Sequence, residues 1–252
     1  MWLVPGRPPA SELCQNKRVP RTSSPQKKSS AQEHAWVVVP MFNEAEVIGP
    51  VVEGLTKHFT NVVCIDDGSS DNSAELAQSA GARVVKHPLN LGQGAALQTG
   101  FDYVMSHPDA THVITFDADG QHLVADALEM LELAQRKRMS VVFGSRFLDK
   151  KSQPGLKKQI VLKLAVLFTR ALTGLRLTDA HNGLRVLSRE ALEHIRLQQN
   201  GMSHATEIVH QIAQSRLAWK EYPVEVLYTE YSKRKGQSLW NSINILIDLI
   251  VR

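Results

Sequence analysis

The segment Phe116-Asp117-Ala118-Asp119-Gly120-Gln121-His122 decides the fold, because it closes a short apolar run that begins at His112. An uninterrupted apolar run of this length is typical of a strand buried on both faces, and the acids mark its carboxyl end. Similar runs are found at 36–39, 62–66, 83–86 and 140–145, and helical patterns separate them at 44–58, 71–80, 92–106 and 122–138. This alternation predicts an α/β fold, with a mainly parallel central sheet and helices on both faces.

Polar residues and glycines follow each of the five predicted strands. In parallel sheets, ligands bind beyond the carboxyl ends of the strands, so these residues are candidates for a single site. In chain order they are Pro40, Asn43, Glu44, Asp66, Asp67, Asn90, Gly92, Gly94, Asp117, Asp119, Gln121 and Arg146. A chance distribution would place such residues at both edges of the sheet, so their grouping predicts a functional edge.

Asp117 and Asp119 place two carboxylates two residues apart at the end of the fourth strand. Hard divalent cations prefer carboxylate oxygens, and Mg²⁺ or Mn²⁺ usually shares one or two of them with the phosphates of a substrate. Such an ion would neutralise a diphosphate and stabilise a leaving nucleotide. A plain polar turn is the better explanation of an isolated Asp-x-Asp-Gly, but the four other polar strand ends favour a metal site.

The other strand ends also have simpler explanations. Asp66-Asp67-Gly68-Ser69 forms a turn before a helix, although such a turn does not require two adjacent acids. Asn43-Glu44 fits a helix cap as well as it fits a ligand contact. Gly92-x-Gly94 at the start of a helix would let backbone amides approach a ligand closely. Leu97 replaces the third glycine of the dinucleotide fingerprint, which argues against a nicotinamide cofactor.

Taken in order along the chain, these motifs resemble the family 2 inverting glycosyltransferases with the GT-A (nucleotide-diphospho-sugar transferase) fold. The matching segments are 37–44, 66–71, 90–96, 116–122, 144–147, 178–185 and 234–238, so the resemblance covers roughly 35–245. Within that family, the pattern is most similar to the polyprenyl-phosphate (dolichyl-phosphate) mannose and glucose synthases. Several motifs in a fixed order are far more specific than any one of them.

On the donor side, the resemblance implies a UDP- or GDP-linked sugar whose nucleotide lies against Pro40, Glu44 and Asp66. The other residues assigned to the donor are Asn43, Asp67, Asn90, Gly92, Gly94, Arg185, Arg234 and Ser238. Which base and which sugar the donor carries is left open by the sequence. We expect no nucleic-acid partner.

On the reaction side, the resemblance implies that Asp119 and Gln121, together with Asp117, coordinate Mg²⁺ or Mn²⁺. Asp117 would also face the ribose and the sugar. Arg146 would meet phosphate charge, to which the guanidinium fork is suited. We therefore expect metal-dependent, inverting transfer of a sugar from a nucleotide-diphosphate donor to an acceptor.

Two residues depart from the family pattern: the first removes a basic contact, and the second concerns the acceptor side. Gln93 stands where many members carry Lys, and Leu184 replaces the usual Phe of Gly-Phe-Arg. Relatives that act on sugar hydroxyls often carry a Glu-Asp pair as catalytic base, and no such pair occurs here. That absence fits a polyprenyl phosphate, which is already ionised at pH 7, although a hydroxyl acceptor stays possible. Asp179 is the best candidate for a catalytic base, and otherwise would orient Arg185 or another cation.

The ends of the chain differ in composition from its centre. Residues 1–34 hold six basic and two acidic residues without an apolar period, which predicts a disordered basic tail before a catalytic domain at 35–232. Between 136 and 176 there are eleven basic residues against one acid, Asp149. The apolar, cation-edged segments 156–176 and 239–251 fit either membrane-interface helices or helices packed on the sheet. We expect a C-terminal basic and apolar segment at 233–252, and peripheral attachment at the cytoplasmic face of a membrane.

Other functional classes fit the sequence poorly. No stretch of about 18 uncharged apolar residues could span a bilayer, and the histidines show no zinc-ligand spacing. In haloacid-dehalogenase phosphatases, the Asp-x-Asp pair ends the first strand, not the fourth. A catalytically inactive, membrane-associated scaffold would be expected to have lost one acid, and both are intact.

Two later segments have alternative explanations. His204-Ala205-Thr206-Glu207 either contacts substrate or caps a helix predicted at 203–216. Trp219 and Tyr222 are expected in the core or in a late hairpin.

Overall fold

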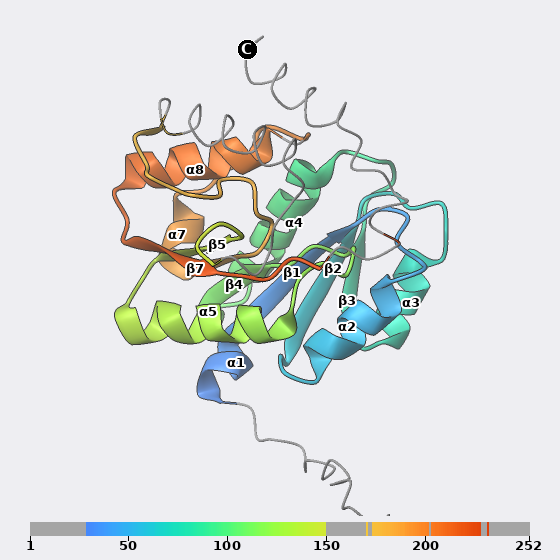
Figure 1. Cartoon of the computed structure of the whole chain (residues 1–252). Helices are drawn as coiled ribbons and strands as arrows, with labels where there is room; N and C mark the ends of the chain where they lie inside the picture. The colour runs from blue at the N-terminus through green and yellow to red at the C-terminus, as the bar shows by residue number, and fades with distance from the viewer. Residues whose placement is uncertain (1–28, 150–169, 171–172, 202, 228–230, 232–252) are drawn as a thin grey trace, which may run out of the picture.

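Seven strands form one sheet within the residues that this computed structural model describes, which are 29–149, 170, 173–201, 203–227 and 231 (Figure 1). In spatial order they are β3 (Arg83–Lys86), β2 (Asn61–Asp66), β1 (Ala35–Met41), β4 (His112–Thr115), β6 (Arg185–Ser188), β5 (Val141–Ser145) and β7 (Trp219–Pro223). Neighbouring strands run parallel, except that β6 is antiparallel to both β4 and β5. The predicted α/β fold with a mainly parallel sheet is confirmed, and β6 is an antiparallel strand that the sequence pattern does not indicate.

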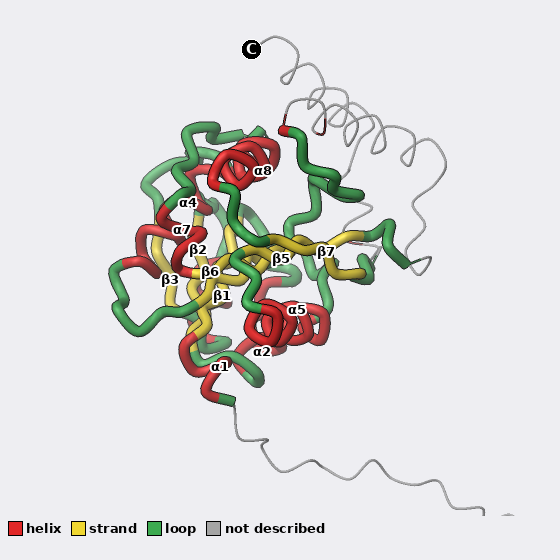
Figure 2. Tube along the Cα trace, turned by 90° about the vertical axis from the view of Figure 1, so that its left-hand side faces the viewer, coloured by secondary structure: helices red, strands yellow, loops and turns green. Residues whose placement is uncertain are grey.

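Helices cover both faces of the sheet (Figures 1 and 2). One layer holds α2 (Ile48–Thr56), α3 (Ser73–Ser79) and α5 (Val124–Lys137), whose apolar residues share one core cluster. The opposite layer holds α4 (Gln93–Met105), α7 (Arg189–Glu193) and α8 (His204–Ser215), which share a second cluster. The helices predicted from periodicity are confirmed, although the first begins at Ile48 and not near residue 44.

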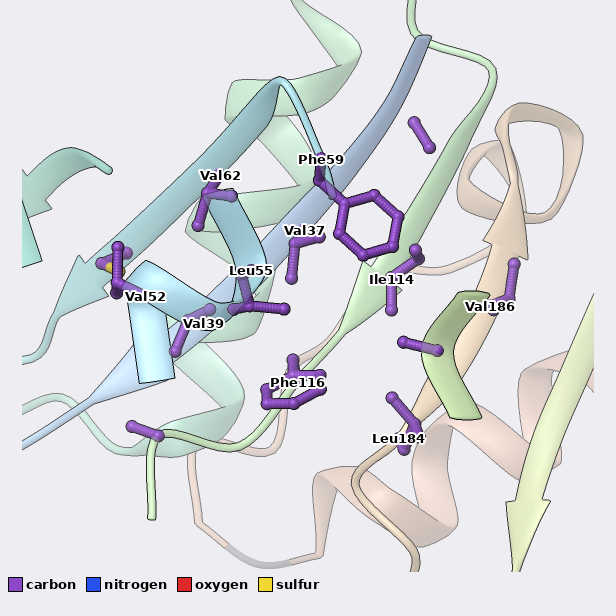
Figure 3. Close-up of a cluster of buried hydrophobic side chains, with 14 of the residues drawn as sticks. Val37, Val39, Val52, Leu55, Phe59, Val62, Ile114, Phe116, Leu184 and Val186 are labelled. Atoms are coloured by element: carbon purple, nitrogen blue, oxygen red, sulfur yellow. The ribbon is translucent and has the colours of Figure 1, made fainter. Parts of the chain in front are cut away.

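Alternate residues of β1 supply both cores. Val37 and Val39 belong to the cluster that contains Leu55 of α2, whereas Val38 belongs to the cluster under α4 (Figure 3). This follows from the two-residue period of a strand, and every residue of β1 is buried. A side chain at Gly100 would collide with Val38, so glycine lets α4 lie directly on the sheet.

The chain is ordered before the predicted boundary at Ala35, because a short helix, α1, spans Ser30–His34. The amide of Thr111 donates to the carbonyl of His34 at 3.0 Å, and the Asn61 side chain donates to the carbonyl of Glu33 at 2.8 Å. Both bonds join backbone carbonyls of α1 to segments far away in the sequence, so the hydrophobic pattern of residues 1–34 does not predict them.

Of the two places expected for Trp219 and Tyr222, the core or a late hairpin, the described residues show no hairpin. β7 pairs in parallel with β5, so Trp219 and Tyr222 lie on an edge strand of the sheet. The ring of Trp219 meets that of Phe143 edge-on, with centroids 6.3 Å apart. Trp219 therefore packs against the core residue Phe143, and its strand runs parallel to β5, whereas the strands of a hairpin are antiparallel.

None of the helices in the described ranges is both long enough and apolar enough to cross a membrane. The proposed lipid-contacting segments, 156–176 and 239–251, lie largely or wholly outside the described residues. Most of the predicted tail, residues 1–28, lies outside them as well.

Candidate active site

The sheet topology brings the predicted strand ends to one edge. All strands except β6 end at this edge, and β6 begins there, with Arg185 opposite Thr115 of β4 and Phe143 of β5. The segment 178–185, which leads into β6, therefore joins the acids that follow β4. The sequence could suggest this segment only through its family pattern, because nothing local indicates the antiparallel strand.

Asp117 lies at the centre of this edge. Its carboxylate accepts hydrogen bonds from Nε2 of His122 at 2.9 Å and from Nε2 of Gln93 at 3.4 Å. The side chain is 30% exposed, so a ligand can still reach it. Thr115 donates to the carbonyl of Gly183 at 2.6 Å, which holds this glycine against the acid. A Cβ atom at Gly183 would lie 2.5 Å from Cγ of Asp117, so only glycine fits there.

Asp119 lies close to two other negatively charged side chains. Its Oδ1 accepts a hydrogen bond from the amide of Gln121 at 3.0 Å, and it forms no ion pair with any residue that the structure describes. Burial raises the pKa of Asp119 to about 6, and the charges of Asp117 and Glu44 act in the same direction. A bound cation would offset the free-energy cost of burying this carboxylate close to two others.

Asp117, Asp119 and Gln121 offer the oxygen ligands that Mg²⁺ and Mn²⁺ prefer. Within the described ranges, no three His, Cys, Asp or Glu side chains gather closely enough to hold a metal ion by themselves. An ion bound here would take its remaining ligands from water or from a substrate phosphate, which is the usual arrangement for Mg²⁺. The residues present therefore fit a substrate-bridging metal and not a structural one.

Arg185 supplies buried positive charge beneath the acids. Its side chain is fully buried, donates to the carbonyl of Ala180 at 3.5 Å, and has no partner for Nε within the described part of the chain. Burial lowers the pKa of Arg185 to about 10, against the opposing effects of Asp117 and Asp179. In turn, burial would raise the pKa of Asp117, but the hydrogen bond from His122 and the charge of Arg185 hold it below its usual range.

Asp179 binds Arg146. Nε and Nη2 of the arginine donate to the two carboxylate oxygens at 2.7 and 3.0 Å, and the Arg146 amide donates at 3.2 Å. Burial would raise the pKa of Asp179, but Arg146 outweighs it and holds the pKa below its usual value. A carboxylate in this state is a weak base, so the alternative that Asp179 orients a cation describes it better. The cation is Arg146 and not Arg185.

Asn43 and Glu44 do not cap a helix, since α2 begins at Ile48 after Val47. Asn43 has a positive φ of 53° and accepts a hydrogen bond from the Ser70 amide at 2.9 Å. The amide of Glu44 donates to Ser73 at 2.7 Å. These bonds join the loops after β1 and β2 into one wall.

The two acids of that wall, Glu44 and Asp66, are buried. Asp66 accepts a hydrogen bond from the Ser69 amide at 3.1 Å, and Pro40 lies beside it in register with Ile65. Tyr231, which belongs to none of the sequence motifs, donates its hydroxyl to Glu44 at 2.6 Å. No local pattern predicts that contact, because it joins residues 187 positions apart.

Asp67 holds a loop. Its two carboxylate oxygens accept from Nδ1 of His87 at 2.8 Å and from the amides of Leu91 and Gly92 at 2.9 and 2.7 Å. The carboxylate is buried, and these bonds fix the segment before α4. The second acid of the Asp-Asp pair therefore has a structural partner set, which sequence spacing could not distinguish from a ligand contact. Asn90, in the same loop, is exposed.

Gly92 and Gly94 let this loop approach residues 199–200. Gly92 has a φ of 99°, and a Cβ atom there would meet the backbone of Asn200. The amide of Gly94 donates to the carbonyl of Asn200 at 2.8 Å. The two remaining candidates, Arg234 and Ser238, lie outside the described residues.

The chain is similar to known glycosyltransferases over most of its length. The family model described as "Glycosyl transferase family 2" matches residues 36–196. An uncharacterized protein of Methanocaldococcus jannaschii is 34% identical over 88% of this chain and 93% of its own length. A UDP-N-acetylglucosamine–dolichyl-phosphate N-acetylglucosaminyltransferase of Methanococcus voltae is 28% identical over 88% of this chain and 96% of its own length. Glucosyl-3-phosphoglycerate synthase from Mycobacterium tuberculosis, in complex with Mn²⁺, UDP and phosphoglyceric acid, has the same fold, with a TM-score of 0.63. The two are 18% identical, and the match covers 87% of this chain and 78% of the synthase.

Proposed function

Because the chain belongs to glycosyl transferase family 2 and is therefore a glycosyltransferase, we propose that it moves a sugar from a nucleoside-diphosphate donor to a polyprenyl phosphate. The proposal includes a divalent cation, Mg²⁺ or Mn²⁺, held by Asp119 and Gln121 with Asp117, and inversion at the sugar carbon. We place the reaction at the cytoplasmic face of a membrane, with the catalytic domain in peripheral contact.

The observation that carries the proposal is the pair of acids after β4. Asp119 has no ion-pair partner among the described residues, and Asp117 and Glu44 add negative charge around it. A cation bridging this pair and a diphosphate would satisfy both groups. When bound, the ion would neutralise the diphosphate and so stabilise the departing nucleotide.

The surrounding residues would then orient the two substrates. Glu44 and Asp66 line the wall between the loops of β1 and β2, where carboxylates can accept hydrogen bonds from a base or a ribose. Arg146, fixed in orientation by the bidentate contact with Asp179, would present its guanidinium to a phosphate group. Because Asp179 holds it in place, little side-chain freedom remains to be lost on binding.

A phosphate acceptor fits the state of the one acid that the sequence offers as a catalytic base. The best candidate, Asp179, is committed to Arg146, and a polyprenyl phosphate is already an oxyanion at neutral pH. The Methanococcus voltae relative is named for a dolichyl-phosphate acceptor, which supports the same class here. A hydroxyl acceptor is the second candidate, and it would require a base that the acids already described do not supply.

The donor half of the proposal is tested by thermal unfolding with UDP or GDP, with and without MnCl₂. One of the two nucleotides should raise the Tm only when Mn²⁺ is present, and at about 100 times Kd the stabilisation is ~2.7 kcal/mol. The variant Asp119→Asn should lose this shift. Asp109→Asn is the control, because Asp109 is exposed and lies before β4, at the opposite edge of the sheet. A wild-type protein that is folded and binds neither nucleotide with Mn²⁺ or Mg²⁺ would contradict the proposal.

The acceptor half is tested with vesicles that contain either dolichyl phosphate or dolichol. Transfer of radiolabelled sugar into the lipid phase should require the phosphorylated lipid. Equal labelling of dolichol, or labelling only of a soluble sugar, would favour the hydroxyl acceptor instead.

A further inference from the structure

The large apolar side chains that the fold leaves exposed gather at one edge of the sheet. In the described ranges, the side chains of this kind are 36% to 57% exposed, and they are Phe42, Leu89, Leu91, Leu148 and Leu227. Each lies one to five residues beyond the end of β1, β3, β5 or β7. These four strands run in the same direction, so their ends share the edge that carries the candidate active site.

This grouping is more informative than the exposure of any one side chain. A single exposed leucine is common on a protein surface and needs no explanation, whereas apolar side chains gathered on one face mark an interaction site. A chance distribution would also leave large apolar side chains exposed on the outer faces of the helices and at the opposite edge of the sheet. Among the residues that the structure describes, neither place has one.

Leu89 and Leu91 are carried by a loop whose backbone is held in place. The carboxylate of Asp67 accepts hydrogen bonds from the amides of Leu91 and Gly92 at 2.9 and 2.7 Å, and Pro88 has no amide hydrogen. A backbone amide without a partner is costly in an apolar environment, and these amides already have one. The loop can therefore enter such an environment without breaking the bonds that fix it.

The surface around these leucines is free of charged residues. The stretch 87–101 contains no Asp, Glu, Lys or Arg, and neither does 197–206. The two stretches touch, because the amide of Gly94 donates to the carbonyl of Asn200 at 2.8 Å. Protein interfaces take much of their affinity from Trp, Tyr and Arg, and none of these occurs in 87–94 or 197–203. An uncharged surface with exposed leucines is better matched to lipid than to a protein partner.

We propose that this edge of the sheet docks on a lipid bilayer, with Leu89 and Leu91 inserted among the lipids. The inference rests on the proposed function, because a polyprenyl phosphate resides in a membrane and its phosphate must reach the candidate active site. It adds the surface that makes the contact, and it orients the sheet with the carboxyl ends of its parallel strands towards the lipid. Leu148 would enter the same interface two residues after Arg146, which is proposed to meet phosphate.

Vesicle binding by the full chain tests the surface. Phosphatidylcholine vesicles are used in about 0.5 M NaCl, which screens the attraction of basic residues to lipid headgroups. Leu89→Ser combined with Leu91→Ser should weaken binding about 10- to 30-fold, because two partly exposed leucines no longer leave water. Thr60→Leu is the control, because it adds a leucine at an exposed position before β2, at the opposite edge, and should not change binding. Equal binding by the wild type and the double serine variant would overturn the inference.

A fluorophore that reports polarity locates the contact. In Cys14→Ser with Leu89→Cys, the introduced thiol carries an NBD group, and the buried Cys64 stays unlabelled. NBD emission should shift to the blue when vesicles are added, whereas emission from Cys14→Ser with Thr60→Cys should not change. Blue-shifted emission at position 89 that is already present without vesicles would show that protein covers the loop, and would overturn the inference.

Transfer to a water-soluble, short-chain prenyl phosphate separates this inference from the proposed function. The double serine variant should keep wild-type transfer to that acceptor and lose transfer to dolichyl phosphate in vesicles. Equal loss with both acceptors would assign the leucines to the active site and overturn the docking surface. Leucine-dependent vesicle binding by a protein that transfers to neither phosphate would instead support the docking surface and refute the acceptor half of the proposed function.

Discussion

At the scale of single residues, the candidate site depends on a glycine, Gly183. Gly183 lies against the carboxylate of Asp117. The hydroxyl of Thr115 donates a hydrogen bond to the carbonyl of Gly183 and so keeps this glycine in place. The absence of a Cβ atom lets the loop before β6 approach the acid, with Arg185 two residues further on. The position of Asp117 therefore depends on a residue that itself carries no functional group.

Replacing Gly183 by Ala should displace the Asp117 carboxylate, because the new methyl group would overlap it. We expect at least about tenfold lower Mn²⁺-dependent activity, which is ~1.4 kcal/mol, and a loss of stability of about 1–3 kcal/mol from overpacking. Activity is measured by sugar transfer and stability by denaturant unfolding. Gly54→Ala is the matched control, because a Cβ atom there would make only an ordinary contact in α2, 3.6 Å from Cγ2 of Val124, and it should stabilise the fold by about 0.5–1 kcal/mol. Wild-type activity in Gly183→Ala would show that the close approach is not required.

At the scale of elements, a buried carboxylate joins β2 to the start of α4. Asp67 receives three hydrogen bonds from the loop between β3 and α4, two of them from backbone amides. A backbone amide buried without an acceptor is costly, so the loop has one strongly preferred position. Through this loop Asp67 also sets the place of Gln93 beside Asp117.

Asp67→Ala should destabilise the protein by roughly 3–5 kcal/mol, because it removes three hydrogen bonds and leaves two amides without acceptors. Hydrogen exchange of the Leu91 and Gly92 amides should accelerate even without nucleotide. Lys86→Ala is the control, since the neighbouring Lys86–Glu75 pair is exposed and its removal should leave the Tm nearly unchanged. Slow exchange at both amides in Asp67→Ala would instead assign Asp67 to ligand binding.

The same scale separates what the sequence can predict from what it cannot. The strands β1 to β5 are predictable because each contains a short run of apolar, often β-branched residues, and the acids at 117 and 119 are predictable as site residues because ligands bind at strand ends. β6 is four residues long, and its direction is decided by partners in β4 and β5. The partners of Asp67 and Asp179 lie 20 to 33 residues away, so composition alone cannot show that one holds a loop and the other an arginine.

At the scale of the whole molecule, a buried neutral histidine makes folding sensitive to acid. The pKa of His204 is lowered to about 4 by burial, against an ordinary value of 6.5. Between these values the unfolded chain binds a proton that the folded protein does not, so stability is complete above about pH 6.5 and declines as the pH falls toward 4. Asp119 acts in the opposite direction, because its pKa is raised and the folded state binds its proton first.

Comparison of the wild type with His204→Gln isolates the histidine, because Asp119 titrates in both proteins. Relative to the variant, the wild type should lose about 1.4 kcal/mol of unfolding free energy per pH unit between pH 6.5 and 4, or roughly 3 kcal/mol in all. Urea denaturation at half-unit pH steps measures the difference. Parallel pH profiles for the two proteins would mean that His204 is protonated in the fold near its ordinary pKa.

The antiparallel strand also has a consequence for synthesis on the ribosome. Within the described residues, β5 pairs only with β6 and β7, and β4 needs β6 on its outer side. About 40 residues separate the end of β5 from the start of β6, which corresponds to ~2–8 s of translation. During that interval β4 lacks the neighbour that pairs with it in the finished sheet, and the acids that follow β4 lack Arg185. The electrostatic balance of the candidate site is therefore completed late, by the strand that also joins β4 to β5.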